Sequence, residues 1–260
     1  MNIVNTHSTS NEQTINLAQA KLTETPIAIC INGISQAVMM ASPIDLKDFA
    51  VGFVIGEGLI ELASDVKNVS ITKLQQGIEV DLTVLARTEH QIKSKRRQLS
   101  GSTGCGLCGV DSIDTAMTLP SLTSSTQTAP SLEIIEQARL SLTDIQKAHD
   151  CIQGHHSAVY FDENGQFVAI REDVGRHNAL DKLIGHIYRE SNKPPTPYSS
   201  HRGFLLMTSR CSHDLVIKAA RGKFNVLITL AQPTNLAVSS AQSIGLTLFS
   251  FVHGKLQQFS

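Results

Sequence analysis

This sequence has almost no net charge, few cysteines and no long apolar segment. The 260 residues carry 22 Lys and Arg against 23 Asp and Glu, so the bulk charge predicts neither nucleic acid nor an anionic membrane as a partner. Five cysteines, an odd number, argue against the disulfide framework of a secreted protein and favour a reducing compartment. No segment approaches the ~18 apolar residues of a membrane span, and the polar start "MNIVNTHSTSNEQ" lacks a signal-peptide pattern. We therefore expect a cytoplasmic protein that binds neither nucleic acid nor a membrane.

The first half of the chain predicts a tail and a small α+β lobe. Residues 1–20 are polar and predict a flexible tail, and residues 21–119 form the lobe. Its first strands, "IAICING" and "SQAVMMA", form a hairpin that turns at Asn32-Gly33. A helix should follow over 42–60, with Ser42 as its N-cap and Pro43 in its first position. The alternation in "GIEVDLTVL" predicts a half-buried strand.

The second half predicts an α/β domain. Residues 120–132 are rich in Ser and Thr and predict a linker, and the domain covers residues 133–260. An amphipathic helix over 134–150 precedes a hairpin that turns at "DENG", and three helices then alternate with strands. Such alternation indicates βαβ crossovers, so we expect an α/β fold with a mixed sheet flanked by helices.

The segment "STGCGLCG" holds two cysteines, Cys105 and Cys108, among glycines. A zinc site needs two further ligands, and the chain has no second C-x-x-C. The zinc deaminase pattern also fails, because Gly104 rather than proline precedes Cys105 and no H-x-E occurs. We therefore expect no metal. Glycines disfavour a helix through the motif, unlike a thioredoxin-type pair. A sulfur carrier and a redox switch both remain open.

Positive charge occurs just upstream, in "KSKRR" at residues 93–97. Such charge would lower the pKa of a nearby thiol and favour the reactive thiolate. A solvated strand edge is the alternative interpretation of the same five residues. Beside an exposed cysteine pair, the two interpretations are about equally good.

Two segments place polar residues where a strand ends and a helix begins. In "REDVGRHNALDK", Arg176 could hold a phosphate or carboxylate, and His177 could transfer a proton near neutral pH. In "MTSRCSHDLV", Ser209 and Arg210 form a second potential anion site, and Cys211 is either a third reactive thiol or a buried small residue. The alternative for the first segment is a structural Arg-Asp network with His177 as a satisfied cap.

Taken together, "FAVGFVIGEGLI", "CGLCG", "REDVGRHNALDKLIG", "SRCSHDLVIKAA" and "FVHGKLQQFS" resemble the FdhD family of accessory sulfurtransferases for formate dehydrogenase. The resemblance implies a cytidine deaminase-like core without zinc chemistry. It implies that Cys105 receives sulfur as a persulfide from a cysteine desulfurase, with Cys108 as its partner. The sulfur would pass to the molybdenum cofactor, Mo-bis(molybdopterin guanine dinucleotide), before that cofactor enters formate dehydrogenase. A guanine nucleotide would mimic part of the cofactor.

The resemblance also implies a cofactor-binding segment near the C-terminus. It consists of Phe251, Val252, His253, Gly254, Lys255 and Leu256. The chain departs from the family pattern at two positions, where His253 replaces an arginine and Cys211 replaces a small residue. The rival function is a chaperone that binds the molybdenum cofactor, uses the cysteine pair as a redox switch and transfers no sulfur. An exposed carrier loop would suit a homodimer with two accessible sites.

Overall fold

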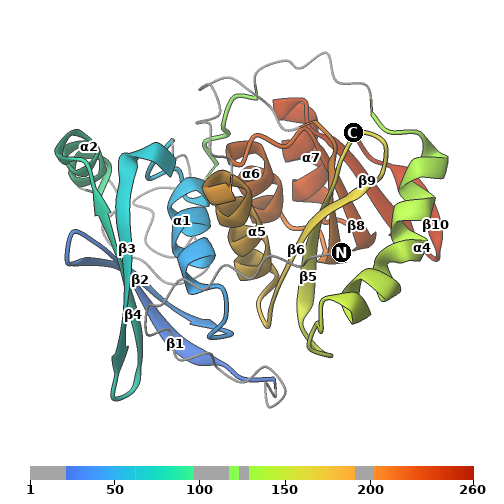
Figure 1. Cartoon of the computed structure of the whole chain (residues 1–260). Coiled ribbons are helices and arrows are strands. Elements are labelled where there is room, and N and C mark those ends of the chain that lie inside the picture. Colours follow the sequence, from blue (N-terminus) through green and yellow to red (C-terminus); the bar gives the residue numbers. More distant parts are fainter. Residues whose placement is uncertain (1–21, 62, 97–116, 123–128, 191–201) are drawn as a thin grey trace, which may run out of the picture.

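The computed structural model describes residues 22–61, 63–96, 117–122, 129–190 and 202–260. Two mixed β-sheets lie on either side of a pair of helices (Figure 1). The elements are β1 (Thr25–Ile31), β2 (Ile34–Ala41), α1 (Leu46–Gly56), β3 (Val66–Leu74), β4 (Gly77–Val84), α2 (Ala86–Arg96), α4 (Leu132–Ala148), β5 (His156–Phe161), β6 (Phe167–Asp173), α5 (Arg176–Glu190), β7 (Phe204–Arg210), α6 (His213–Arg221), β8 (Val226–Ala231), α7 (Asn235–Ile244), β9 (Thr247–Val252) and β10 (Lys255–Gln258). The predicted α/β class and the mixed sheet flanked by helices are confirmed, whereas the likeness to cytidine deaminases and the domain limits stay predictions. None of the helices in the described ranges is long and apolar enough to cross a membrane.

The smaller sheet has the strand order β2-β1-β4-β3. Its predicted hairpin is confirmed: β1 and β2 pair antiparallel, and Asn32 and Gly33 between them have φ angles of 47° and 75°, the left-handed values that a two-residue turn requires. The predicted alternation in β4 is also confirmed, because Ile78, Val80, Leu82 and Val84 are all buried. The alternation therefore predicted correctly which face of β4 is buried.

The start of α1 differs from the prediction. The helix begins at Leu46, and its N-cap is Asp45, which has a φ of 52° and makes no side-chain cap hydrogen bond. The predicted cap, Ser42, is instead bonded to residues more than 100 positions later in the chain. Because these tertiary bonds occupy both its backbone N–H and its hydroxyl, Ser42 does not cap the helix.

The structure tests one of the two interpretations of the basic segment "KSKRR", residues 93–97. Residues 93–96 form the end of α2, so the strand-edge interpretation is wrong for them. Residue 97 lies outside the described ranges. The expected influence of this charge on the cysteine pair therefore stays a prediction.

The larger sheet has the strand order β10-β9-β8-β7-β5-β6. Strands β7, β8 and β9 are parallel, whereas β5 runs antiparallel to both β6 and β7. Helices α5, α6 and α7 cover one face, and α4 packs on the other through Ile135, Ala138 and Leu142 (Figure 1). The predicted order of helices and strands over 134–252 is confirmed, and β10 adds a strand after it.

Helices α1 and α5 cross in close contact between the two sheets. A Cβ atom on Gly52 would lie 1.6 Å from the Asp181 carbonyl oxygen, and one on Gly185 would lie 1.9 Å from the Asp48 carbonyl oxygen. Only glycine fits at such a backbone approach. The hydrophobic core runs continuously from the smaller sheet through these helices to the larger one. The crossing thus fixes where the start of α5 lies.

Candidate functional site

The ends of several strands and the starts of several helices meet at one edge of the larger sheet. Strands β6, β7, β8 and β9 all end at this edge, because β6 and β7 both oppose β5 and the other two run parallel to β7. The N-termini of α5, α6 and α7 follow directly. Helix N-termini carry partial positive charge and unpaired N–H groups, so their convergence favours an anionic ligand.

The structure brings the two predicted anion sites into contact. Nε2 of His177, in the first turn of α5, lies 3.2 Å from Oγ of Ser212 and 3.9 Å from a carboxylate oxygen of Asp214. Ser212 is the N-cap of α6 but makes no side-chain cap hydrogen bond. The first N–H groups of α6 are therefore not capped by this side chain.

Arg176 supplies positive charge at the same place. Its Nε atom is buried and has no hydrogen-bond partner among the described residues. Burial first, and then the charge of Arg176, lower the pKa of His177 to about 4 and also lower the pKa of His156. His177 is therefore uncharged at neutral pH, where it can accept or donate a hydrogen bond but adds no cation.

A structural ion-pair network was the alternative interpretation of "REDVGRHNALDK". Such a network is present around Asp173, but it does not include Arg176. The Asp173 carboxylate lies 2.7 Å from Lys182 Nζ, and both side chains are 0% exposed. It also accepts hydrogen bonds from Ser42 N, Gly175 N and Asn178 Nδ2, at 2.9, 2.8 and 3.0 Å. Asp173 therefore pairs with a lysine nine residues later and leaves Arg176 available for a ligand.

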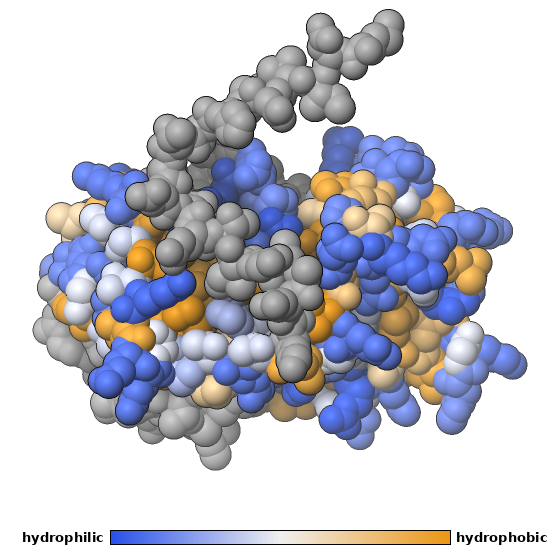
Figure 2. Space-filling model, turned by 60° about the horizontal axis from the view of Figure 1, so that its bottom comes forward, coloured by the Kyte–Doolittle hydropathy of each residue, from blue (hydrophilic) through white to orange (hydrophobic). Residues whose placement is uncertain are grey.

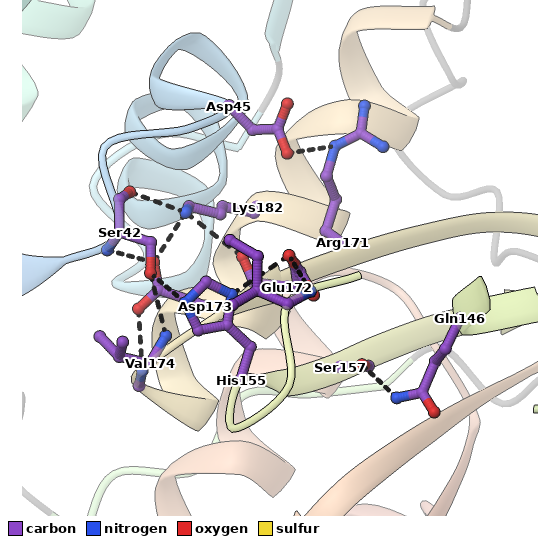
Figure 3. A network of polar contacts seen from close by, with 12 residues as sticks. Ser42, Asp45, Gln146, His155, Ser157, Arg171, Glu172, Asp173, Val174 and Lys182 are labelled. Carbon is purple, nitrogen blue, oxygen red and sulfur yellow. Dashed lines mark hydrogen bonds and ion pairs between the residues drawn. The ribbon is translucent and has the colours of Figure 1, made fainter. Parts of the chain in front are cut away.

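Ser42 connects the two halves of the chain at this network (Figure 3). Its hydroxyl accepts a hydrogen bond from Val174 N at 3.2 Å and lies 2.9 Å from His155 Nε2. Lys182 donates to the Ser42 carbonyl oxygen at 3.0 Å. The sequence analysis gave none of these three residues a part in this network: Ser42 was assigned as a helix cap, Lys182 ends the segment "REDVGRHNALDK" without a role, and His155 was not singled out. Their roles depend on contacts across the fold.

A second buried charge cluster joins α1, α5 and α6. Lys218 Nζ lies 2.7 Å from Glu57 Oε1 and 2.9 Å from both oxygens of Asp181. Burial raises the pKa of Asp181 to about 7, although Lys218 opposes that rise. Burial also acts to raise the pKa of Glu57, but Lys218 outweighs it and holds this pKa below its ordinary value. Two carboxylates thus share one lysine beside His177.

Cysteines in the described ranges are poor nucleophiles. Cys211 is fully buried, which raises the pKa of its thiol to about 12, so the buried small residue is the better of its two interpretations. Burial and Glu172 raise the pKa of Cys151 to about 12, and burial raises that of Cys30. Cys105 and Cys108 lie outside the described ranges.

The remaining predicted site residues occupy different positions around this edge. Ser209 is buried and donates to the Arg210 carbonyl oxygen at 3.0 Å, and Arg210 is exposed. Phe251 is 6% exposed and packs below Arg139, whose guanidinium carbon lies 5.2 Å from the ring centre. Val252 ends β9, and Leu256 in β10 packs against the same core as Phe251.

His253 and Gly254 form the turn between β9 and β10, with φ angles of 50° and 75°. Lys255, at the start of β10, is exposed. This turn lies at the same edge of the sheet as the start of α5, but β9 is two strands, roughly 10 Å, from β7. The edge therefore offers two groups of residues, one around Arg176 and one at the turn.

Comparison with known proteins finds a family whose sequence model matches most of this chain. The model of the FdhD/NarQ family matches residues 22–259. The sulfur carrier protein FdhD of Cupriavidus necator is 39% identical over 229 residues, which cover 88% of this chain and 77% of that protein. The protein of the same name from Burkholderia mallei is 40% identical over 236 residues, covering 88% and 83%. A crystal structure of a proposed formate dehydrogenase accessory protein from Desulfotalea psychrophila has a TM-score of 0.63 and 24% identity over 92% of this chain and 87% of that one, which supports the fold alone.

Proposed function

Because the chain belongs to the FdhD/NarQ family, we propose that it is a sulfur carrier that assists formate dehydrogenase in a reducing cytoplasm. Cys105 accepts sulfur as a persulfide from a cysteine desulfurase, and Cys108 is its partner. The sulfur then passes to Mo-bis(molybdopterin guanine dinucleotide) before this substrate enters formate dehydrogenase. The observation that carries the proposal is the buried Nε atom of Arg176, which has no hydrogen-bond partner in the described ranges, at the place where the helix N-termini converge.

The anion-binding edge of the larger sheet suits the guanine dinucleotide part of the substrate. A diphosphate needs several donors and compensating positive charge, which Arg176 and the starts of α5 and α6 provide. His177 and His156 have lowered pKa values, so they stay neutral and can hydrogen-bond to ring edges. Lys255 at the neighbouring turn is exposed to a ligand on the same edge.

The raised pKa values of the buried thiols support the assignment of the sulfur-accepting step to Cys105. In the first step a thiolate attacks the terminal sulfur of the desulfurase persulfide, the S–S bond breaks, and the desulfurase thiolate leaves. A thiol with a pKa of about 12, like that of Cys151 or Cys211, is ionised to only about one part in 100,000 at pH 7. The proposal therefore assigns the step to Cys105 rather than to a buried thiol.

Mass spectrometry tests the sulfur transfer. After incubation with a desulfurase and cysteine, we expect one added sulfur atom on the peptide that contains Cys105. Cys105→Ser should remove this addition, whereas Cys151→Ser, a change at a half-buried cysteine, should keep it. An undiminished addition in Cys105→Ser would show that another residue carries the sulfur.

Binding of guanosine diphosphate tests the second part, and together with the mass measurement it separates the carrier from the rival chaperone. We expect Arg176→Ala to weaken binding, measured by calorimetry, by about tenfold or more. Arg202→Ala is the matched control, because Arg202 is 81% exposed and lies 3.8 Å from Glu163. A protein that binds the nucleotide but gains no sulfur at Cys105 would be the chaperone instead.

A further inference from the structure

A buried lysine joins three helices below the ligand site, the group of residues around Arg176 at the starts of α5 and α6. Charged side chains mostly lie on protein surfaces, and hydrophilic residues cover much of the face drawn in Figure 2. The Lys218 side chain, in contrast, is only 8% exposed and lies among α1, α5 and α6, which pack side by side (Figure 1). A buried lysine is costly unless carboxylates compensate its charge. Its carboxylate partners therefore decide where it is held.

Two contacts between α5 and α6 lie one helical turn apart. In the first turn of each helix, His177 of α5 meets Asp214 of α6, with 3.9 Å between Nε2 and a carboxylate oxygen. Four positions later on each helix, Asp181 meets Lys218, with 2.9 Å between Nζ and each carboxylate oxygen. Residues four positions apart lie on the same face of a helix. The ion pair therefore lies in the same seam between the helices as the ligand site, roughly 6 Å along the helix axis from it.

The end of α1 closes this seam from the side. Glu57, the C-cap of α1, places Oε1 2.7 Å from Lys218 Nζ. A Cβ atom on Gly56 would lie 2.6 Å from Asp181 Oδ1 and 3.2 Å from Lys218 Nζ, so only glycine leaves room for the three charges here. Arg221 of α6 donates to the Gly56 carbonyl oxygen at 2.9 Å and so fixes the end of α1 on α6. Two helices other than its own thus hold Lys218.

We propose that Lys218 is a positioning residue for the ligand site: it holds the first turns of α5 and α6 against each other and sets the charge beside His177. This inference rests on the proposed function, because it takes the starts of these helices as the place where the anionic ligand binds. Without the lysine, α6 would lose its tie to α5, and the carboxylates of Glu57 and Asp181 would repel each other. The contact of 3.2 Å between His177 Nε2 and Ser212 Oγ, one turn away, would then loosen.

The charge of Lys218 also acts on His177. Burial is the first cause that lowers the pKa of His177 to about 4, the cations Arg176 and Lys218 come next, and Glu57 opposes them. Removal of Lys218 should therefore raise this pKa, and removal of the Glu57 charge should lower it further. The charged and titratable groups around His177 are Arg176 on its own helix, Asp214 and Lys218 on α6, Glu57 at the end of α1 and His156 on β5.

Binding of guanosine diphosphate to the full chain, measured by calorimetry, tests the positioning. We expect Lys218→Met to weaken binding about tenfold or more, because the first turns of α5 and α6 lose the tie between them. Lys147→Met is the matched control, since Lys147 is 75% exposed on α4, on the other face of the larger sheet, and this variant should bind like the wild type. A folded Lys218→Met chain that binds as tightly as the wild type would overturn the proposal.

The protonation of His177, followed by NMR of histidine-labelled protein at about pH 4.5, gives a readout that needs no ligand. Lys218→Met should raise the charged fraction of His177, and Glu57→Gln should lower it, because the two changes remove opposite charges. A merely loosened fold would expose His177 to water and raise its charged fraction in both variants. Shifts in the same direction, or no shift in Lys218→Met, would contradict the assigned role.

The two readouts separate this inference from the proposed function. A wild type that does not bind guanosine diphosphate would contradict the proposed ligand, and the NMR measurement would then decide the role of Lys218. If circular dichroism shows that Lys218→Met is unfolded, Asp181→Asn/Lys218→Met takes its place in both measurements, because it leaves no unpaired charge at the buried pair.

Discussion

The buried ion pair between Lys182 and Asp173 allows a sharp prediction about stability. Replacement of Lys182 by methionine keeps much of the side-chain volume and removes the charge, so the change leaves little cavity. The Asp173 carboxylate then stays fully buried without its cation, which lay 2.7 Å away. Breaking one partner of a buried pair costs about 3–5 kcal/mol.

The hydrogen bonds that remain set the expected magnitude. After the change Asp173 still accepts from Ser42 N, Gly175 N and Asn178 Nδ2, so its charge keeps three donors. We therefore expect a loss near the lower limit, about 3 kcal/mol, in the free energy of unfolding. For a protein of this size that corresponds to a melting temperature lower by about 6–12 °C.

Urea unfolding followed by circular dichroism measures this loss. Lys147→Met is the control, because Lys147 is 75% exposed and lies 3.9 Å from Asp144; it should change stability by less than about 0.5 kcal/mol. The double variant Asp173→Asn/Lys182→Met should be more stable than the sum of the two single changes implies, since it leaves no unpaired charge. A loss under about 1 kcal/mol in Lys182→Met would refute the assigned role of the pair.

Three further predictions follow from the site and the core. His177 has a pKa of about 4 in the folded protein against an ordinary 6.5, so the unfolded chain binds more protons between these values and stability should fall by up to about 3 kcal/mol as the pH drops from 6.5 to 4. His177→Gln should flatten that part of the curve from urea unfolding, and an unchanged slope would point to another group. Gly52→Ala would place a Cβ 1.6 Å from a backbone oxygen; we expect a loss of more than about 4 kcal/mol in the same assay, and a mild effect would contradict the close helix crossing. In a chain without Cys105 and Cys108, the raised pKa values of Cys30, Cys151 and Cys211 should slow alkylation by iodoacetamide at least about tenfold relative to the urea-unfolded chain; rapid labelling of the folded protein, read by mass spectrometry, would contradict their assignment as poor nucleophiles.

Local patterns predicted the elements well and their ends less well. The Asn32-Gly33 turn and the alternation in β4 depend only on neighbouring residues, and both were right. The start of α1 was wrong because Ser42 forms bonds with residues that no local pattern connects to it. Residues 93–96 were open to a strand-edge interpretation because charged residues without an apolar period carry little structural signal.

Sequence by itself determined the family resemblance, the alternation of helices and strands, and the choice of Arg176, His177 and the cysteine pair as candidates. Only the tertiary structure showed that the two anion sites meet through His177 and Ser212. It alone showed that Asp173 pairs with Lys182 and that Nε of Arg176 has no hydrogen-bond partner among the described residues. The physical reason is distance along the chain: the order of strands in a sheet and the crossing of α1 with α5 decide which residues meet when, like Ser42 and Asp173, they lie 131 positions apart.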